Sequence, residues 1–473
     1  MLFTLQEIAS ITDGRWLVPP PEPAMHVTGI VDDSREAFAD SLFVAIRGDR
    51  VDGHAHVADA VKRSVAGVCT DRLMGDAVQA LLRERGIAQL CVPDTLCAFH
   101  QIAAAHRRLF AEVPVIAVTG SSGKTSCRAM VEAILEKAYP GHVLATAGNT
   151  NNHFGVPRNV LRLRSHHRAA VLELGTNHPG EIASLAAIVQ PTVGVITNVG
   201  HAHLEYLLTL EGVAREKGAL FSALPPDGVA VFPQNCEQVE ILRDCAGERR
   251  KLTFGASGQE DVMVNYYGLA GDNTFKCSLR WLDAGEERMV TWAVGGRHQA
   301  SNAAAAAAAC TALGIDPDTI AAGLAQTRLP AMRMEICRRN GIAWVNDAYN
   351  ANPDSVRAAV EWFLEVSNGT SDEQKIVVLG DMLELGNDSR AAHETLLEWV
   401  AQRVSDARVV TVGPLMMQAA AGRDVPSFLD AAHAVPYLER RVKKGTWLFL
   451  KGSRGMHLES VISAMQKPQK NRR

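Results

Sequence analysis

The chain has 473 residues, a formal net charge of -4, 47% hydrophobic residues and 21% charged residues. This composition is typical of a globular protein with room for two to four domains, and the small net charge excludes a global attraction to nucleic acid or to an anionic membrane. No apolar run approaches the ~18 residues of a membrane-spanning helix, no signal peptide is recognisable, and nine scattered cysteines without a C-x-x-C pair predict a reducing compartment, the cytoplasm.

We expect three domains, at residues 1–100, 101–327 and 328–473. In the first domain, LFVAI at 42–46 is an apolar run of strand length, and the alanine- and valine-rich stretch near 56–66 is typical of a helix. The first region is therefore predicted to be a small α/β domain.

The central domain alternates predicted strands and helices. VPVIAVTG at 113–120 is a continuous apolar run, typical of a strand buried on both faces, and similar runs follow at 169–175 and 193–200. This alternation predicts a parallel sheet with helices on its faces. Residues 225–295 are β-like, and Ser301–Leu313 predicts a tightly packed helix built mainly of alanine.

The C-terminal domain alternates in the same way and is joined to the central domain by a linker near Pro330. Four apolar runs of strand length are separated by helical segments: IAWVNDA (342–348), KIVVLGD (375–381), ARVVTVG (407–413) and GTWLFLKG (445–452). A second, smaller doubly wound sheet is expected here. The predicted fold class of the whole chain is therefore α/β.

The segment Thr119–Thr125 (TGSSGKT) lies between a predicted strand and a predicted helix, where it indicates a phosphate-binding loop. In such loops, backbone N–H groups and the helix N-terminus face the phosphate oxygens. Gly120 and Gly123 permit the close approach of the backbone to phosphate. Lys124 is expected to neutralise the β- and γ-phosphates of ATP, and the hydroxyl of Thr125 to bind Mg²⁺.

The loop departs in one respect from the usual G-x-x-x-x-G-K-[ST] pattern, because Val118 occupies the position of the first glycine. Ser121 and Ser122 in the loop, and Ser126 directly after it, are also expected to contact the nucleotide. The structural alternative is an ordinary strand–turn–helix junction that contains Gly-Lys-Thr by chance. The strand before the loop and the helix after it favour the phosphate loop.

Three further residues of the central domain are candidates for binding a metal ion beside the γ-phosphate. Glu173, in LELG, ends one predicted strand, and His203, in NVGHAHLE, follows the next one. Ligands of parallel sheets bind at the carboxyl ends of the strands. Each candidate has a structural alternative: a surface charge for Glu173, a helix cap for His203, and a solvated side chain for Lys217 in AREKGALF.

These residues belong to a longer series of motifs that resembles the Mur ligases of peptidoglycan synthesis. The motifs follow one another in the same order over essentially the whole chain: DSR, LFVAI and DGH (32–54), TGSSGKT, GNTNNHFGVP (148–157), LELGTNHPGEI (172–182), NVGHAHLE (198–205), GRHQASN (296–302), RMEI (333–336), NDAYNANPDS (346–355), VLGDMLELG (378–386) and KGSRGM (451–456). The resemblance implies an N-terminal domain for a UDP-sugar, a central ATPase domain and a Rossmann-like C-terminal domain.

The resemblance also implies which residues bind the metal ions and the nucleotide. Thr125 and Glu173 would hold one Mg²⁺, and His203 and Lys217 would hold a second. Lys217 matches a lysine that is carbamylated in relatives, and a carbamate converts this cation into an oxygen ligand, which suits Mg²⁺. The residues that would contact the nucleotide, the last two of them after domain closure, are Asn302, Arg333 and Asp347.

For the other substrates, the resemblance implies that Ser34 and Arg35 lie at the uridine-nucleotide site and that Asn149 and Asn152 lie on the muramyl-peptide side. The residues expected to bind a dipeptide in the C-terminal domain are Tyr349, Asn350, Asn352, Ser355, Lys451 and Arg454. Alternatively, YNANP is a turn with a helix N-cap, and the lysine and arginine of KGSRG are ordinary loop charges.

The motifs are most similar to those of the family member that joins D-alanyl-D-alanine to UDP-N-acetylmuramoyl-tripeptide. We expect ATP to phosphorylate the terminal carboxylate of the tripeptide, with Lys124, Arg333 and two Mg²⁺ ions, the second of them held by His203 and Lys217, stabilising the transferring phosphoryl group. The amine of the dipeptide then displaces phosphate. We expect a monomer without a nucleic-acid or membrane partner.

Three other functions stay open at this point. One is a sister ligase that adds a single amino acid, although the DNPR-like motif typical of that relative is not found. The others are a folylpolyglutamate-type ligase and a nucleotide-gated switch. Two departures from the family pattern also stand out: Gln299 replaces an asparagine, and Asp40-Ser41 replaces a Gly-Asp pair ahead of LFVAI.

Overall fold

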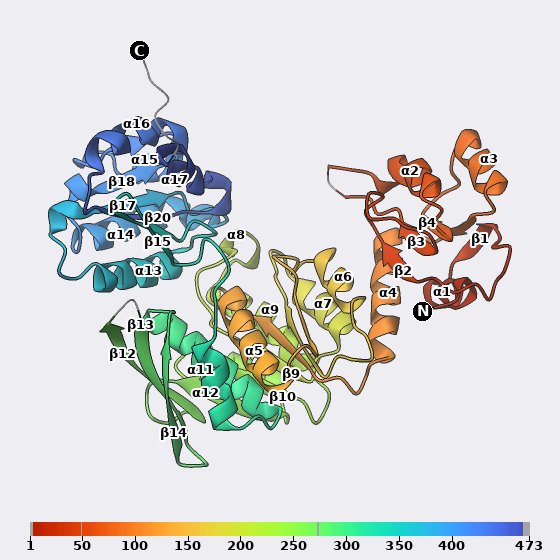
Figure 1. Cartoon of the computed structure of the whole chain (residues 1–473), viewed down its shortest axis with the longest axis horizontal. Coiled ribbons are helices and arrows are strands. Elements are labelled where there is room, and N and C mark those ends of the chain that lie inside the picture. Colours follow the sequence, from red (N-terminus) through yellow and green to blue (C-terminus); the bar gives the residue numbers. More distant parts are fainter. Residues whose placement is uncertain (1–2, 49, 272–273, 467–473) are drawn as a thin grey trace. The chain divides into compact units, whose positions relative to one another are not determined.

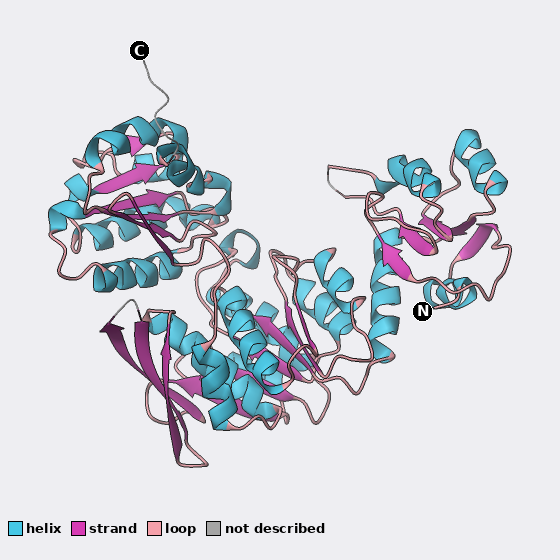
Figure 2. Ribbon diagram, viewed as in Figure 1, coloured by secondary structure: helices cyan, strands magenta, loops and turns pink. Residues whose placement is uncertain are grey.

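The computed structural model describes residues 3–48, 50–271 and 274–466, and its helices and strands are drawn in Figures 1 and 2. The chain divides into two compact units. The first unit comprises Met1–Val115, Leu144–Leu174 and Ala183–Pro191, and the second comprises Ile116–Val143, Gly175–Ile182 and Thr192–Arg473. The predicted α/β class is confirmed, whereas the boundaries of the three domains stay a prediction. In the described part of the chain, no helix combines the length and the apolarity needed to cross a membrane.

The first unit contains a five-stranded sheet with the strand order β1-β5-β4-β3-β2. The strands are β1 (Arg15–Val18), β2 (Gly29–Val31), β3 (Ser41–Val44), β4 (Gly67–Thr70) and β5 (Ala88–Cys91). β1 is antiparallel to β5, and the other pairs are parallel. All residues of β3 are buried, which confirms the strand predicted from LFVAI.

Short helices surround this sheet and supply its core. They are α1 (Leu5–Thr12), α2 (Val57–Lys62) and α3 (Asp76–Glu84). One core cluster joins Phe43 of β3 to Val57 and Val61 of α2 and to Leu82 of α3. The remaining elements in this part of the sequence are α4 (Thr95–Arg108), β7 (Val143–Ala145), α6 (Gly155–Val160), β8 (Ala169–Glu173) and α7 (Glu181–Val189).

In the second unit, the strands around the phosphate loop lie in the order β14-β13-β12-β11-β10-β9-β6. Their bounds are β6 (Val115–Thr119), β9 (Val193–Ile196), β10 (Val229–Pro233), β11 (Arg250–Gly255), β12 (Val262–Gly271), β13 (Thr274–Trp281) and β14 (Glu286–Trp292). Neighbours from β6 to β12 are parallel, and β12, β13 and β14 form an antiparallel meander. The parallel sheet that we predicted is therefore extended by antiparallel strands.

The alanine-rich segment forms α11 (Arg297–Ala312), and every residue from Ala303 to Ala309 is fully buried. α11 packs against α5 (Lys124–Ala138), the helix that follows the phosphate loop, and α12 (Pro317–Ala325) packs against α5 as well. Side chains as small as alanine let helix backbones approach closely. The other helices here are α8 (Leu204–Leu207), α9 (Leu210–Ser222) and α10 (Val239–Ala246).

The C-terminal part contains a six-stranded sheet with the order β15-β16-β20-β17-β18-β19. Its strands are β15 (Glu335–Arg339), β16 (Ile342–Asn346), β17 (Lys375–Gly380), β18 (Val409–Val412), β19 (Ser427–Phe428) and β20 (Trp447–Lys451). All pairs are parallel except β15–β16. The four predicted strands are confirmed as β16, β17, β18 and β20, and the helices are α13 (Pro353–Val366), α14 (Ser389–Ala401), α15 (Pro414–Ala419), α16 (Ala431–Arg441) and α17 (Glu459–Met465).

Candidate active site

The loop between β6 and α5 has a backbone that only glycine accommodates at two positions. Gly120 has a φ of +150°, and a Cβ there would lie 1.9 Å from Oγ1 of Thr197. Gly123 has a φ of +78°, and a Cβ there would lie 2.4 Å from Oδ1 of Asn302. Both a left-handed backbone and a steric clash therefore exclude side chains, and α5 begins directly afterwards at Lys124.

Asn198, which the sequence did not single out, holds this loop in place. Its backbone oxygen accepts a hydrogen bond from Ser121 N at 3.1 Å, and its side-chain Oδ1 accepts one from Ser122 N at 2.9 Å. Lys124 Nζ donates to the carbonyl oxygen of Gly120 at 2.7 Å. The ammonium group therefore lies across the loop itself. Asn198 belongs to the predicted apolar run at 193–200 and begins the motif NVGHAHLE, but neither pattern indicated that it supports the phosphate loop.

Arg333 from the linker reaches the same loop. Its Nη2 donates to Oγ1 of Thr125 at 2.8 Å, and its guanidinium carbon lies 4.2 Å from the centre of the Tyr349 ring. A guanidinium over an aromatic face is stabilised by the ring quadrupole. The structure therefore places Tyr349 beneath Arg333, where it orients a cation next to the hydroxyl predicted to bind Mg²⁺.

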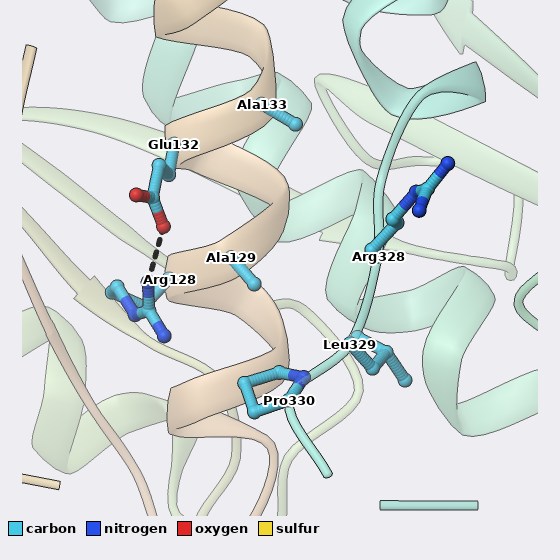
Figure 3. Close-up of a pocket in the computed structure, with 7 residues that line it drawn as sticks. All are labelled: Arg128, Ala129, Glu132, Ala133, Arg328, Leu329 and Pro330. Carbon is cyan, nitrogen blue, oxygen red and sulfur yellow. Dashed lines mark hydrogen bonds and ion pairs between the residues drawn. The ribbon is translucent and has the colours of Figure 1, made fainter. Parts of the chain in front are cut away.

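The linker that carries Arg333 also passes beside the loop helix. Figure 3 shows the groove where they meet, which is lined by Arg128, Ala129, Glu132, Ala133, Arg328, Leu329 and Pro330. The two small alanine side chains of α5 face the linker, and Arg128 turns toward Glu132, with which it forms an ion pair. The linker residues in this groove, 328–330, lie only a few positions before Arg333. The packing against α5 therefore supports the linker close to the point where it reaches the loop.

Asp347 and Lys451 form a buried ion pair at the ends of β16 and β20. Lys451 Nζ donates to Asp347 Oδ2 at 2.5 Å and to the carbonyl oxygen of Asn350 at 3.1 Å. Only 4% of Lys451 is exposed, and the other carboxylate oxygen of Asp347 accepts from Met334 N at 3.1 Å. The alternative of an ordinary loop charge is therefore wrong for Lys451, whose charge is neutralised inside the protein.

Gln299, which departs from the family pattern, is engaged inside the protein. Its Oε1 accepts a hydrogen bond from Asn302 Nδ2 at 3.1 Å, and its Nε2 donates to Sδ of Met334 at 3.4 Å. The ring nitrogen Nε2 of His298 lies 2.9 Å from the same sulfur. Gln299 thus orients the amide of Asn302, the side chain that lies against Gly123.

Lys217 lies on α9 with 0% of its surface exposed, so the alternative of a solvated side chain is wrong. Its Nζ has no hydrogen-bond partner among the residues that the structure describes. Burial lowers the pKa of Lys217 well below its ordinary value, and the nearby charge of Lys124 lowers it further, while Glu216 acts in the opposite direction. Glu216 itself accepts hydrogen bonds from Gly180 N at 2.7 Å and Ile182 N at 2.8 Å.

His203 occupies the N-cap position of α8, but its side chain makes no capping hydrogen bond. The capping alternative is therefore wrong for the imidazole. Its Nδ1 lies 2.7 Å from Oε2 of Glu384 in the GDMLELG segment. Burial lowers the pKa of His203, and this effect is opposed by the hydrogen bond to Glu384. The imidazole is thus held by a carboxylate, and the sequence did not predict this partner.

In the first unit, Glu173 ends β8 with 1% of its surface exposed, so the surface-charge alternative is wrong. Its Oε1 accepts a hydrogen bond from Asn151 Nδ2 at 2.8 Å, and its backbone N–H donates to Oγ1 of Thr146 at 2.8 Å. Asn149 and Asn152 are both exposed, and Oδ1 of Asn152 accepts from the N–H of Gly155 at 3.0 Å. Asn151, which lies between the two predicted asparagines, therefore contacts the carboxylate.

The DSR segment of the first unit is partly exposed and is held by a local ion pair. Arg35 pairs with Asp33 at 2.6 Å, with 86% of its side chain exposed, and Ser34 between them is half-buried. The hydrogen bond from Arg35 lowers the pKa of Asp33 to about 2. Asp40 has a φ of +63°, a conformation that glycine adopts most readily and that aspartate tolerates better than most side chains.

The YNANP segment does form a helix cap. Asn352 Oδ1 accepts from Ser355 N at 2.8 Å, and Asn352 N donates to Ser355 Oγ at 3.0 Å, which makes a reciprocal cap at the start of α13. The N-cap alternative is therefore confirmed for Asn352. Asn350 is exposed, and Arg454 Nη1 donates to Oε1 of Glu459 at 2.8 Å.

Comparison with known proteins gives a consistent result along the chain. Residues 118–310 match the Mur ligase middle domain, and residues 332–454 match the Mur ligase glutamate ligase domain. A UDP-N-acetylmuramoyl-tripeptide--D-alanyl-D-alanine ligase from Bacillus subtilis is 32% identical over 97% of each chain. The crystal structure of MurF from Acinetobacter baumannii superposes with a TM-score of 0.88 and 32% identity over 98% of this chain and 99% of that one. MurF ligase from Thermotoga maritima in complex with ADP gives a TM-score of 0.79 and 25% identity over 94% and 97%.

Proposed function

The chain belongs to the Mur ligase family, and we propose that it joins D-alanyl-D-alanine to UDP-N-acetylmuramoyl-tripeptide, forming ADP and phosphate, in peptidoglycan precursor synthesis. The observation that carries the proposal is the meeting of two cations at one loop. Lys124 lies across the loop backbone, and Arg333, 208 residues after Thr125, donates to the Thr125 hydroxyl. Such an arrangement suits the transfer of a charged phosphoryl group.

The reaction proceeds through an activated acid. The terminal carboxylate of the tripeptide attacks the γ-phosphorus of ATP, giving an acyl phosphate and ADP. The amine of D-alanyl-D-alanine then attacks the acyl carbon, and the C–O bond to phosphate breaks. The loop N–H groups that do not donate to Asn198 bind the phosphate oxygens, Lys124 and Arg333 neutralise the transferring group, and the closed site excludes water from the acyl phosphate.

Mg²⁺ is part of this proposal. Among the described residues, no three His, Cys, Asp or Glu side chains are grouped to hold a metal ion, and Mg²⁺ commonly completes its ligand shell with phosphate and water oxygens. A carbamate on Lys217 would supply a further oxygen ligand, and a buried amine without a hydrogen-bond partner among the described residues supports that assignment. Thr125, Glu173 and His203 are the other proposed ligands. When bound, Mg²⁺ supplies positive charge that stabilises the transferring phosphoryl group.

The remaining contacts are assigned by chemistry and by family pattern. Asn302 and Asp347 are proposed to contact the nucleotide, together with Ser121 and Ser122 of the loop and Ser126 in the first turn of α5. Residues proposed for the UDP-sugar and peptide are Ser34, Arg35, Asn149 and Asn152, and those proposed for the dipeptide are Tyr349, Asn350, Asn352, Lys451 and Arg454. We further propose a monomer that acts in the cytoplasm, where ATP and the nucleotide-linked precursor are available.

Phosphate release with each substrate omitted in turn tests the proposal. We expect release only when ATP, UDP-N-acetylmuramoyl-tripeptide and D-alanyl-D-alanine are all present, because the acyl phosphate is discharged by the amine. Single amino acids in place of the dipeptide test the sister-ligase activity in the same assay. Slow release that depends on neither acid nor amine would instead identify a nucleotide-gated switch and refute the ligase.

A further inference from the structure

His203 is held by a carboxylate from a distant part of the sequence. Its Nδ1 lies 2.7 Å from Oε2 of Glu384, a residue in the loop after β17. An ionised carboxylate has no proton to donate, so Nδ1 must carry the hydrogen of this bond. In a neutral imidazole, Nε2 then keeps its lone pair, which is the form required of a metal ligand. The contact therefore selects one tautomer of His203.

The backbone is left-handed on both sides of this hydrogen bond. His203 has a φ of +56° and Glu384 a φ of +65°, values in the left-handed region that L-residues adopt only at a cost in free energy. Gly386 has a φ of +61°, and a Cβ there would lie 2.9 Å from Cα of Glu205. The helix α8 that follows His203 packs against the turn Gly386–Asp388. Strained residues gathered on both sides of one hydrogen bond indicate a constraint that the surrounding structure maintains.

A second carboxylate, that of Asp354, binds the segment just before His203 but makes no hydrogen bond to the His203 imidazole. Oδ2 of Asp354, in the first turn of α13, accepts a hydrogen bond from His201 N at 3.1 Å and lies 3.3 Å from Nδ1 of the His201 ring. Asp354 and Glu384 therefore both dock this loop, but only Glu384 contacts the imidazole that is proposed to bind metal. The pair allows docking and ring orientation to be separated by experiment.

We propose that Glu384 is a positioning residue that fixes the tautomer and ring orientation of His203 and thereby sets the affinity of the adjacent divalent-cation site. This inference rests on the proposed function, because only the proposed ligase activity makes His203 a metal ligand. Partners that hold the second nitrogen of a ligating histidine commonly change metal affinity 10- to 100-fold when they are removed. Since Glu384 follows β17 while His203 follows β9, cation binding and docking of these two segments stabilise each other.

The experiment compares Glu384→Ala and Glu384→Gln with Asp354→Asn and with Glu394→Gln. Glu394 forms an exposed ion pair with Arg390 on α14, so its variant controls for the loss of one charge from the same part of the chain. One readout is the tautomer of His203 in the full-length, metal-free protein, measured by ¹⁵N NMR of labelled histidine. The other is the dissociation constant of Mn²⁺ in the presence of ADP, measured by EPR.

We expect Glu384→Ala to lose the Nδ1–H tautomer preference and to weaken Mn²⁺ binding roughly 10- to 100-fold. Glu384→Gln should lose less, because its amide oxygen still accepts a hydrogen bond, and Asp354→Asn and Glu394→Gln should remain within about threefold of wild type. Glu384 is exposed, so the folded state should survive its replacement. An unchanged tautomer and unchanged Mn²⁺ affinity in Glu384→Ala would overturn the inference, as would an equal loss in Asp354→Asn. A wild-type protein that binds no Mn²⁺ with ADP would instead refute the proposed function.

Discussion

Replacing Arg333 with lysine keeps the positive charge at the phosphate loop but removes the planar guanidinium. In the structure this group makes two contacts at once. It donates to Oγ1 of Thr125 at 2.8 Å and lies 4.2 Å from the centre of the Tyr349 ring. A lysine ammonium cannot reproduce the flat geometry that stacks on the ring while donating sideways. The substitution therefore tests orientation separately from charge.

The size of the expected effect follows from these two contacts. A hydrogen bond from a charged donor contributes about 1.5–3 kcal/mol, and a guanidinium over an aromatic ring contributes about 0.5–2 kcal/mol. A combined loss of about 2–5 kcal/mol corresponds to roughly a 30- to 5,000-fold decrease in kcat/KM. The thermal midpoint should change little, because the contacts lie at a site and not in a hydrophobic core.

The assay is phosphate release with ATP, UDP-N-acetylmuramoyl-tripeptide and D-alanyl-D-alanine, with circular dichroism as the check on folding. Tyr349→Phe and Tyr349→Leu provide matched controls. The first keeps the ring and should remain within about threefold of wild type, whereas the second should lose roughly 5- to 30-fold, equivalent to about 1–2 kcal/mol. Because the two residues act through one contact, Tyr349→Leu should cost less in the Arg333→Lys background than in wild type.

Two results would refute this reasoning. Wild-type kcat/KM in Arg333→Lys would show that the guanidinium geometry is irrelevant to the reaction. Equal losses in Tyr349→Phe and Tyr349→Leu would show that the hydroxyl of Tyr349, and not its ring, is what the site uses.

Four further measurements test other parts of the site and of the fold. Lys124→Ala should lose nearly all activity with an unchanged circular dichroism spectrum, and wild-type turnover would contradict its assignment to phosphate. Gly120→Ala should weaken ADP binding at least tenfold in calorimetry because of its clash with Thr197, whereas Gly314→Ala, also at positive φ but in open space, should bind normally. ¹³C-labelled bicarbonate should give a carbamate signal in NMR that is lost in Lys217→Met; no signal in wild type would remove the proposed ligand. Burial lowers the pKa of His106 to about 4. As the pH falls below about 6.5, the unfolded state therefore binds a proton at this residue before the folded state does, and the contribution of His106 to the free energy of unfolding should fall by about 2 kcal/mol between pH 7 and pH 5. Urea titrations in which His106→Gln shows the same pH dependence as wild type would exclude this cause.

Local patterns in the sequence were sufficient for the elements that are buried and regular. The strands β6, β8, β9, β16, β17, β18 and β20 were all visible as apolar runs, because strands buried on both faces contain few polar residues. β15 (Glu335–Arg339) was not predicted, since its residues Glu-Ile-Cys-Arg-Arg are mostly exposed at the edge of the sheet and carry no apolar signal. The edge strands β2 and β19 were missed because they are only three and two residues long, which is too short for a recognisable apolar run.

The phosphate loop illustrates what local sequence can establish about a site. A buried strand, two glycines and a Gly-Lys-Thr junction are contiguous, so the chain itself specifies the turn, and the positive φ values of Gly120 and Gly123 follow from it. The structural alternatives for Glu173 and Lys217 were rejected only by burial, which depends on neighbours from other elements. The same holds for Asn198, whose role consists of hydrogen bonds to a loop that lies far away in the sequence.

By itself, then, the sequence determined the α/β class, the glycine loop and the order of the motifs, because these depend on residues that are adjacent in the chain. Only the tertiary structure decided that Arg333 meets Thr125 over the ring of Tyr349, that Lys451 is neutralised by Asp347, and that Glu384 holds His203. Each of these pairs joins segments that are separated by tens to hundreds of residues. A hydrogen bond or an ion pair acts over about 3 Å, and which distant groups come within that distance is set by the packing of sheets and helices, which no local pattern records.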